Sequence, residues 1–188
     1  MNLKRLSVAA GAAIALIGVP LVSGSPVLAN LQRAGESIIA AIQGADVELQ
    51  LVAEKKVVTT NAEGEEVVAW QDLGAKAQVL PGDTLRYSVA GKNIGDKGAE
   101  NLVINQDIPE GMVYVLASAQ TASNASVTFS IDDGQTFVAN PTIQVQQPDG
   151  SLLEQPAPAE MYTDVKWEFE NTLTPELGVD ASYEVQIP

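Results

Sequence analysis

The chain contains no cysteine and no histidine, and both absences restrict what it can do. Without cysteine no disulfide can cross-link the fold, so its stability must come from apolar burial and strand pairing. Without either residue type, a serine–histidine triad, a cysteine nucleophile and the usual zinc sites are excluded. A carboxylate pair or a serine–lysine arrangement would remain for catalysis, and the sequence marks neither. We therefore expect a protein that is not an enzyme and has no catalytic residues.

Basic residues are also scarce. Lysine and arginine number 10 against 24 aspartates and glutamates, which gives a formal net charge of −14. A surface of this charge repels nucleic acid and anionic lipid, so neither is an expected partner. It would attract divalent cations and favours solubility.

The first 29 residues have the pattern of a secretory signal peptide. A basic pair, Lys4 and Arg5, precedes the apolar run Val8–Val22, and Val27–Ala29 forms a small-residue cleavage site. An uncleaved anchor is the weaker interpretation, because a proline and several glycines interrupt the run. Cleavage would leave a chain that begins at Asn30, carries a net charge of 8 − 24 = −16 and does not insert into the membrane. We expect it outside the inner membrane: extracellular, on the cell surface or in the periplasm.

Residues 30–45 differ from the rest of the chain and allow two interpretations. Leu31–Gly44 has apolar residues at three- and four-residue spacing, which predicts a short amphipathic helix. The segment Ser37–Ile42 can also be an extended apolar arm that adds a strand to a neighbouring subunit. In that case Ile38, Ile39 and Ile42 are the candidate assembly residues.

From Asp46 onward the apolar period is two, which indicates strands. The runs are short, end at turn residues and have no long helix between them, and this pattern is typical of an antiparallel sandwich. We therefore predict one all-β domain over residues 46–188, an immunoglobulin-like antiparallel β-sandwich preceded by the short helix or arm. The predicted strands are Val47–Leu51, Val57–Thr60, Glu65–Trp70, Ala75–Val79, Thr84–Val89, Leu102–Ile104, Met112–Ala117, Ser126–Ile131, Thr142–Gln146, Asp164–Glu170 and Ala181–Ile187.

The forty residues Leu80–Ala119 carry a family resemblance. A Pro-Gly-Asp turn is followed by an aromatic strand, the turn Asn93–Gly98, a second strand, the turn Asp107–Gly111 and a third strand. This order resembles the domain of unknown function eleven, an immunoglobulin-like repeat of bacterial and archaeal surface proteins. The resemblance implies an immunoglobulin-like fold and a place at the cell surface, and it names no molecular activity.

Three aromatic residues divide into core and surface candidates. Trp167 and Phe169 alternate with charged residues, so we expect both in the core. Trp70 lies at the end of its run and is the candidate for stacking on a ligand such as a polysaccharide. The segment Leu152–Met161, with two prolines, predicts a stiff loop that would complete such a site.

Acidic residues at two turns offer a candidate calcium site. Ser130–Phe137 fits Ser-x-Asp-x-Gly-x-Thr-aromatic and resembles the Asp-box hairpin, with Phe137 where tryptophan is usual; this predicts a stabilised hairpin. Its acids Asp132 and Asp133, with Asp107 and Glu110 at the other turn, are the calcium candidates. Calcium needs six or more oxygen ligands, and no EF-hand spacing is present, so turn formation and surface charge explain these acids more simply.

These observations favour a secreted, non-enzymatic structural or adhesive surface module. It would bind itself or other surface proteins and would self-assemble through its N-terminal segment. The alternative is an extracellular carbohydrate- or ligand-binding β-sandwich module built around Trp70. No cofactor is expected unless the calcium candidates bind their ion.

Overall fold

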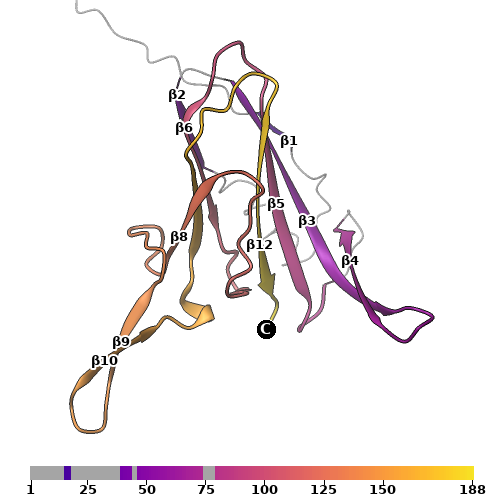
Figure 1. Ribbon diagram of the computed structural model, residues 1–188. Helices are drawn as coiled ribbons and strands as arrows, with labels where there is room; N and C mark the ends of the chain where they lie inside the picture. Colours follow the sequence, from indigo (N-terminus) through magenta and orange to yellow (C-terminus); the bar gives the residue numbers. More distant parts are fainter. Residues whose placement is uncertain (1–14, 18–38, 44–45, 74–78) are drawn as a thin grey trace, which may run out of the picture.

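The computed structural model describes residues 15–17, 39–43, 46–73 and 79–188, and the fold is all-β (Figure 1). Two sheets, here called the large and the small sheet, face each other, and a two-stranded ribbon projects from them. The large sheet contains β1 (Ala15–Ile17), β3 (Val47–Thr60), β4 (Glu66–Asp72), β5 (Thr84–Asn93), β7 (Val113–Tyr114) and β12 (Gly178–Gln186). The small sheet contains β2 (Ile39–Gln43), β6 (Glu100–Asp107), β8 (Ala125–Ser130) and β11 (Asp164–Phe169). The ribbon consists of β9 (Thr142–Gln146) and β10 (Leu152–Pro156), followed by the 3₁₀ turn η1 (Ala159–Met161).

The chain crosses repeatedly between the two sheets. The large sheet has the order β1-β3-β5-β12-β7, with β4 paired to the second half of β3, and the small sheet has the order β2-β6-β11-β8. All pairings between these strands are antiparallel except β1 with β3, which is parallel. Strands distant in sequence are therefore neighbours, and β12 at the end of the chain lies between β5 and β7.

The core forms between the two sheets from the positions that the alternation predicted. Leu49, Tyr87 and Tyr183 of the large sheet are fully buried, as is Trp167 of the small sheet. The rings of Tyr87 and Tyr183 stack with their centres 5.5 Å apart, and the ring of Trp167 lies 6.3 Å from that of Tyr183. Phe169 is buried as well, so the prediction that both aromatic residues of β11 belong to the core is confirmed.

Two predicted segments differ from the structure. The run Met112–Ala117 is a strand only at Val113 and Tyr114, because the chain turns at Ala117, whose φ is 62°. One more backbone hydrogen bond runs from the Val115 N–H to the Glu184 carbonyl of β12. Leu152–Met161 was predicted as a loop, and this is wrong for its first half, which is strand β10. Pro156 is tolerated because it stands at the end of the strand, where a missing backbone donor disrupts little pairing. The predicted strand Ala75–Val79 lies almost entirely outside the described residues.

The predicted N-terminal helix or arm is described only at Ile39–Gln43. These five residues form β2, which pairs antiparallel with β6 of the same chain, so the helical alternative is wrong for them. Residues 39–43 form a strand because they pair along the edge of β6 that β11 leaves open. This pairing satisfies backbone N–H and C=O groups on both segments. The remainder of Leu31–Gly44, including Ile38, lies outside the described residues. In the part of the chain that is described, no helix is long and apolar enough to cross a membrane.

Candidate functional site

The predicted hairpin at Ser130–Phe137 is held by side chains that bond to its own backbone. Ser130 Oγ accepts hydrogen bonds from the N–H groups of Asp132 and Gly134, at 3.1 and 2.9 Å. Asp132 accepts from the Thr136 backbone N–H at 2.8 Å and from Thr136 Oγ1 at 2.6 Å. The hydrogen bonds from Thr136, joined by one from Ser130, hold the pKa of Asp132 below its usual value. The prediction of a stabilised hairpin is confirmed.

Replacing Ser130 by alanine is expected to destabilise the protein. The change leaves two turn N–H groups without their acceptor beside a fully buried position, at a cost of about 1–3 kcal/mol. Urea denaturation followed by circular dichroism measures the loss. Ser126→Ala, at an exposed position near the start of the same strand, is the control and should change the free energy of unfolding little. Equal effects of the two changes would contradict the role assigned to Ser130.

A pair of carboxyl groups, Asp107 and Asp164, lies beside this hairpin, and no pattern in the sequence predicts it. The two residues are cross-strand partners on β6 and β11. Asp164 accepts hydrogen bonds from Thr163 Oγ1 at 2.8 Å and from Asn105 Nδ2 at 3.4 Å. Burial, and the neighbouring carboxyl group of Asp107, raise the pKa of Asp164. A pair of this kind has the chemistry of a general acid and base.

The hairpin shields one member of this pair, Asp164, whereas Asp107 is half-buried. Asp164 is only 5% exposed, and Gly134 of the hairpin lies against it. A Cβ atom at Gly134, whose φ is +74°, would stand 3.3 Å from Asp164 Oδ1, so the turn covers the carboxyl group closely. We interpret the pair as a structural contact between the hairpin and the small sheet.

The calcium candidates are not gathered into one site. Asp132 is occupied by its own turn, Asp133 is exposed, and Asp107 lies beside Asp164. Glu110 is exposed in the turn after β6. Within the described ranges, no group of three or more acidic side chains is placed to hold a metal ion. The four acidic residues considered as calcium ligands therefore lie in separate environments and do not form one site.

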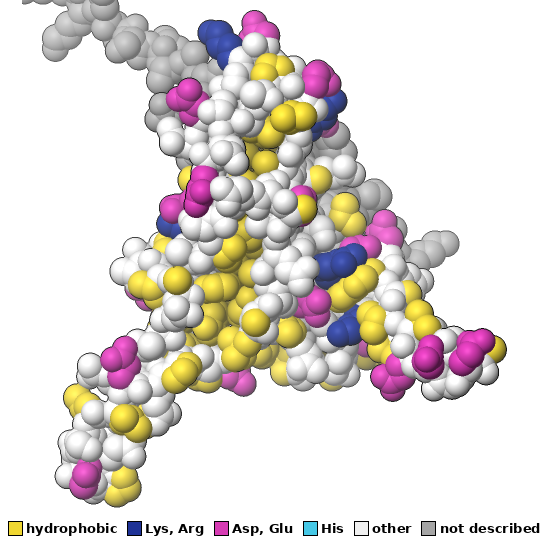
Figure 2. Space-filling model, viewed as in Figure 1, with side chains coloured by type: hydrophobic (Ala, Val, Ile, Leu, Met, Phe, Trp, Pro, Cys, Tyr) yellow, Lys and Arg dark blue, Asp and Glu magenta, His cyan; other side chains and the backbone are white. Residues whose placement is uncertain are grey.

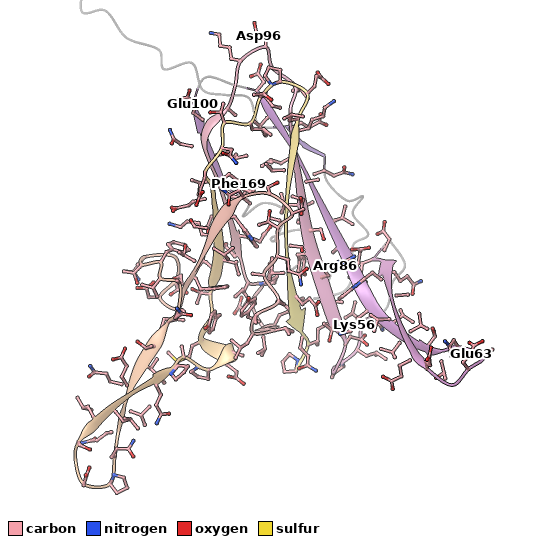
Figure 3. The ribbon with its side chains drawn as sticks, viewed as in Figure 1. Lys56, Glu63, Arg86, Asp96, Glu100 and Phe169 are labelled. Atoms are coloured by element: carbon pink, nitrogen blue, oxygen red, sulfur yellow. The ribbon has the colours of Figure 1, made fainter. Side chains whose placement is uncertain are left out.

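The surface around Trp70 is a charged cross-strand cluster. Arg86 of β5 stacks over the indole ring at 4.3 Å, and Lys56 of β3 lies 5.9 Å from the ring centre. Arg86 also bonds to Glu54 through two nitrogens. Figure 3 shows Lys56 and Arg86 close together on the outer side of the large sheet. Arg86 therefore occupies one face of the Trp70 ring, and that face is not free to stack on a sugar.

The structure also separates Trp70 from the segment predicted to complete its site. Trp70 lies on β4, while Leu152–Met161 belongs to the ribbon and η1, on the opposite side of the molecule in Figure 1. The two features do not form one binding surface. A ligand site that combines them is thus not supported.

Two hairpins project from the same end of the molecule, and both expose apolar side chains (Figures 1 and 2). On the β3–β4 hairpin, the cross-strand partners Val58 and Val68 are 53% and 51% exposed. On the β9–β10 ribbon, Leu152 is 63% exposed, and Leu153 pairs across the ribbon with Val145. Alternation predicted three of these four segments as strands, and the segment that forms β10 was predicted as a loop. That they leave the core was not visible in the sequence, because exposed and buried strands share one period.

Comparison with known proteins identifies no similar protein. No protein-family model, curated protein or solved structure matches the chain. The resemblance of Leu80–Ala119 to the domain of unknown function eleven therefore stays a prediction.

Proposed function

We propose that this protein is a secreted, non-enzymatic structural or adhesive module of a microbial surface, with an immunoglobulin-like sandwich as its scaffold. The observation that carries the proposal is the β9–β10 ribbon. Within the described residues β9 and β10 form a sheet of their own, and every residue of β10 is exposed. An isolated two-stranded ribbon is only marginally stable in water, so exposed leucines on it favour a partner surface.

Two further observations support association over catalysis. Asp164 lies against Gly134 of the hairpin, and Arg86 covers one face of the tryptophan expected to bind ligand. The N-terminal candidate Ile39 pairs with Asn105 of its own chain, and Ile42 lies at an irregularity of the same strand β2, so donation of this segment would require exchange of β2 between copies. The partner is another copy or a second surface protein.

Substitution on the ribbon tests the proposal. The double variant Leu152→Thr and Leu153→Thr keeps β-propensity but removes apolar surface, and it should weaken self-association or cell-surface binding about tenfold or more, since each buried leucine contributes about 1.5–3 kcal/mol. Light scattering across a concentration series and binding of the labelled protein to cells are the measurements.

The matched control changes leucines that are equally exposed but lie in turns. Leu80→Thr with Leu177→Thr should leave association unchanged. Thermal unfolding of both double variants establishes that each is folded. A wild-type protein that neither associates nor binds cells, or that is not exported by its own N-terminal segment, would contradict the proposed function.

A further inference from the structure

The two halves of β3 have different neighbours on the outer edge of the large sheet. Glu54–Thr60 pairs with β4, and the Leu73 N–H donates to the Ala53 carbonyl at 2.9 Å. The second half of β3 therefore has no free outer edge for another strand. Glu48–Gln50 pairs instead with β1, in parallel. The first half of β3 thus receives its outer backbone partners from Ala15–Ile17.

β1 lies inside the apolar run that the sequence marks as a signal peptide. Export with cleavage after Ala29 would remove β1 and leave the outer backbone groups of Glu48–Gln50 without partners, while β5 stays on the inner side. An open strand edge of this kind is a template for another strand. The side chains of Val47, Leu49 and Leu51 remain in the core, so the edge keeps a fixed shape.

We propose that β1 covers an association edge, and that in the processed protein Val47–Leu51 pairs antiparallel with the same segment of a second copy. This inference rests on the export proposed above. β4 closes the edge from Ala53 onward, so an incoming strand must be short. Self-pairing centred on Leu49 uses the three residues that β1 covers, Glu48–Gln50, and stays clear of β4.

The side chains of Val47–Leu51 are compatible with antiparallel pairing between two copies of this segment. A two-fold interface sets the same surface against itself, and centring on Leu49 keeps core-facing positions together on one side of the extended sheet. Glu48 then stands opposite the uncharged amide of Gln50 in the second copy, so no two carboxylates oppose each other despite the acidic composition. The large sheet would continue through both copies.

Because the chain has no cysteine, single introduced thiols can report this register. Secreted, processed protein carrying Glu48→Cys is mixed with protein carrying Gln50→Cys under mild oxidation. The two positions would lie within reach of a disulfide, since opposed Cβ atoms are about 4.5–5.5 Å apart. We expect about tenfold more linked dimer than in a control mixture, because pairing raises the effective thiol concentration.

The control mixture combines Glu48→Cys with Ala90→Cys. Ala90 is exposed and is the β5 partner of Gln50, but it lies one strand inside the edge. The same Glu48 and Gln50 variants in the full chain, made without export so that β1 is retained, should link no more than this control. Light scattering on the wild-type processed and full chains gives a second measurement that does not depend on the cysteines folding correctly.

These experiments distinguish failure of the β3 pairing from failure of the proposed surface function. Equal linking in test and control mixtures, equal linking with and without residues 1–29, or a processed protein that stays monomeric would each overturn the β3 pairing. The proposed surface function would stand in all three cases if cell binding still depends on Leu152 and Leu153. A chain that is not exported would overturn the proposed function as well.

Discussion

Replacing Trp167 by alanine is expected to remove a large part of the stability of this protein. The indole is fully buried between the sheets, and substitutions of this kind cost about 3–5 kcal/mol. A domain of this size is stable by only about 5–15 kcal/mol, so the variant should unfold at much lower urea concentrations. Circular dichroism is the suitable probe, since Trp70 would be the only indole left.

The phenylalanine variant separates packing from polarity at the same position. Trp167 Nε1 has no hydrogen-bond acceptor in the described part of the chain, so the wild-type core already contains an unsatisfied buried donor. Trp167→Phe removes this donor and keeps most of the ring, and it should cost clearly less than the alanine change. Equal losses in the two variants would contradict the assignment of the stability to packing of the ring.

Replacing Asp164 by asparagine is expected to stabilise the protein at neutral pH. The wild-type carboxyl is buried next to Asp107, and both effects disfavour its charge. Asparagine keeps an acceptor for Asn105 and supplies an N–H₂ group that can donate to Asp107. For a chain of this length, each kcal/mol recovered raises the melting temperature by about 2–4 °C.

The pH dependence gives a second test of the same variant. The pKa of Asp164 is raised in the folded state, so its protonated form favours folding: that stabilisation is complete below the unfolded value and is lost as the pH rises through the folded value. The wild type should therefore lose stability from moderately acidic toward neutral pH, and Asp164→Asn should flatten this decline.

Asp132 is the contrasting case and serves as an internal reference. Its pKa is lowered by hydrogen bonds, chiefly from Thr136, so its contribution is present above the unfolded value and is lost as the pH falls through the folded value. Asp164→Asn should leave this acid-side loss unchanged. A variant with the same pH profile as the wild type on the neutral side would contradict the role assigned to Asp164.

Much of the fold was predictable because one face of most strands is buried. Alternation located Leu49 in β3, Tyr87 in β5, Trp167 in β11 and Tyr183 in β12, and all four are core residues. Turn chemistry was equally local: Ser130, Asp132 and Thr136 bond within seven residues, so their pattern alone predicted the hairpin. Such features depend on neighbours in sequence, which the sequence displays directly.

The sequence by itself determined that the chain is all-β, strongly acidic and without the residues for thiol, imidazole or zinc chemistry. Only the tertiary structure decided what depends on pairing between distant segments. In the structure Asp164 lies beside Asp107, and Arg86 lies over Trp70. Thr142–Pro156 lies outside the sandwich, and the edges of β3 and β6 pair with β1 and β2. The physical reason is that a strand's period fixes which of its faces is apolar, whereas its neighbours are chosen by the packing of the whole chain.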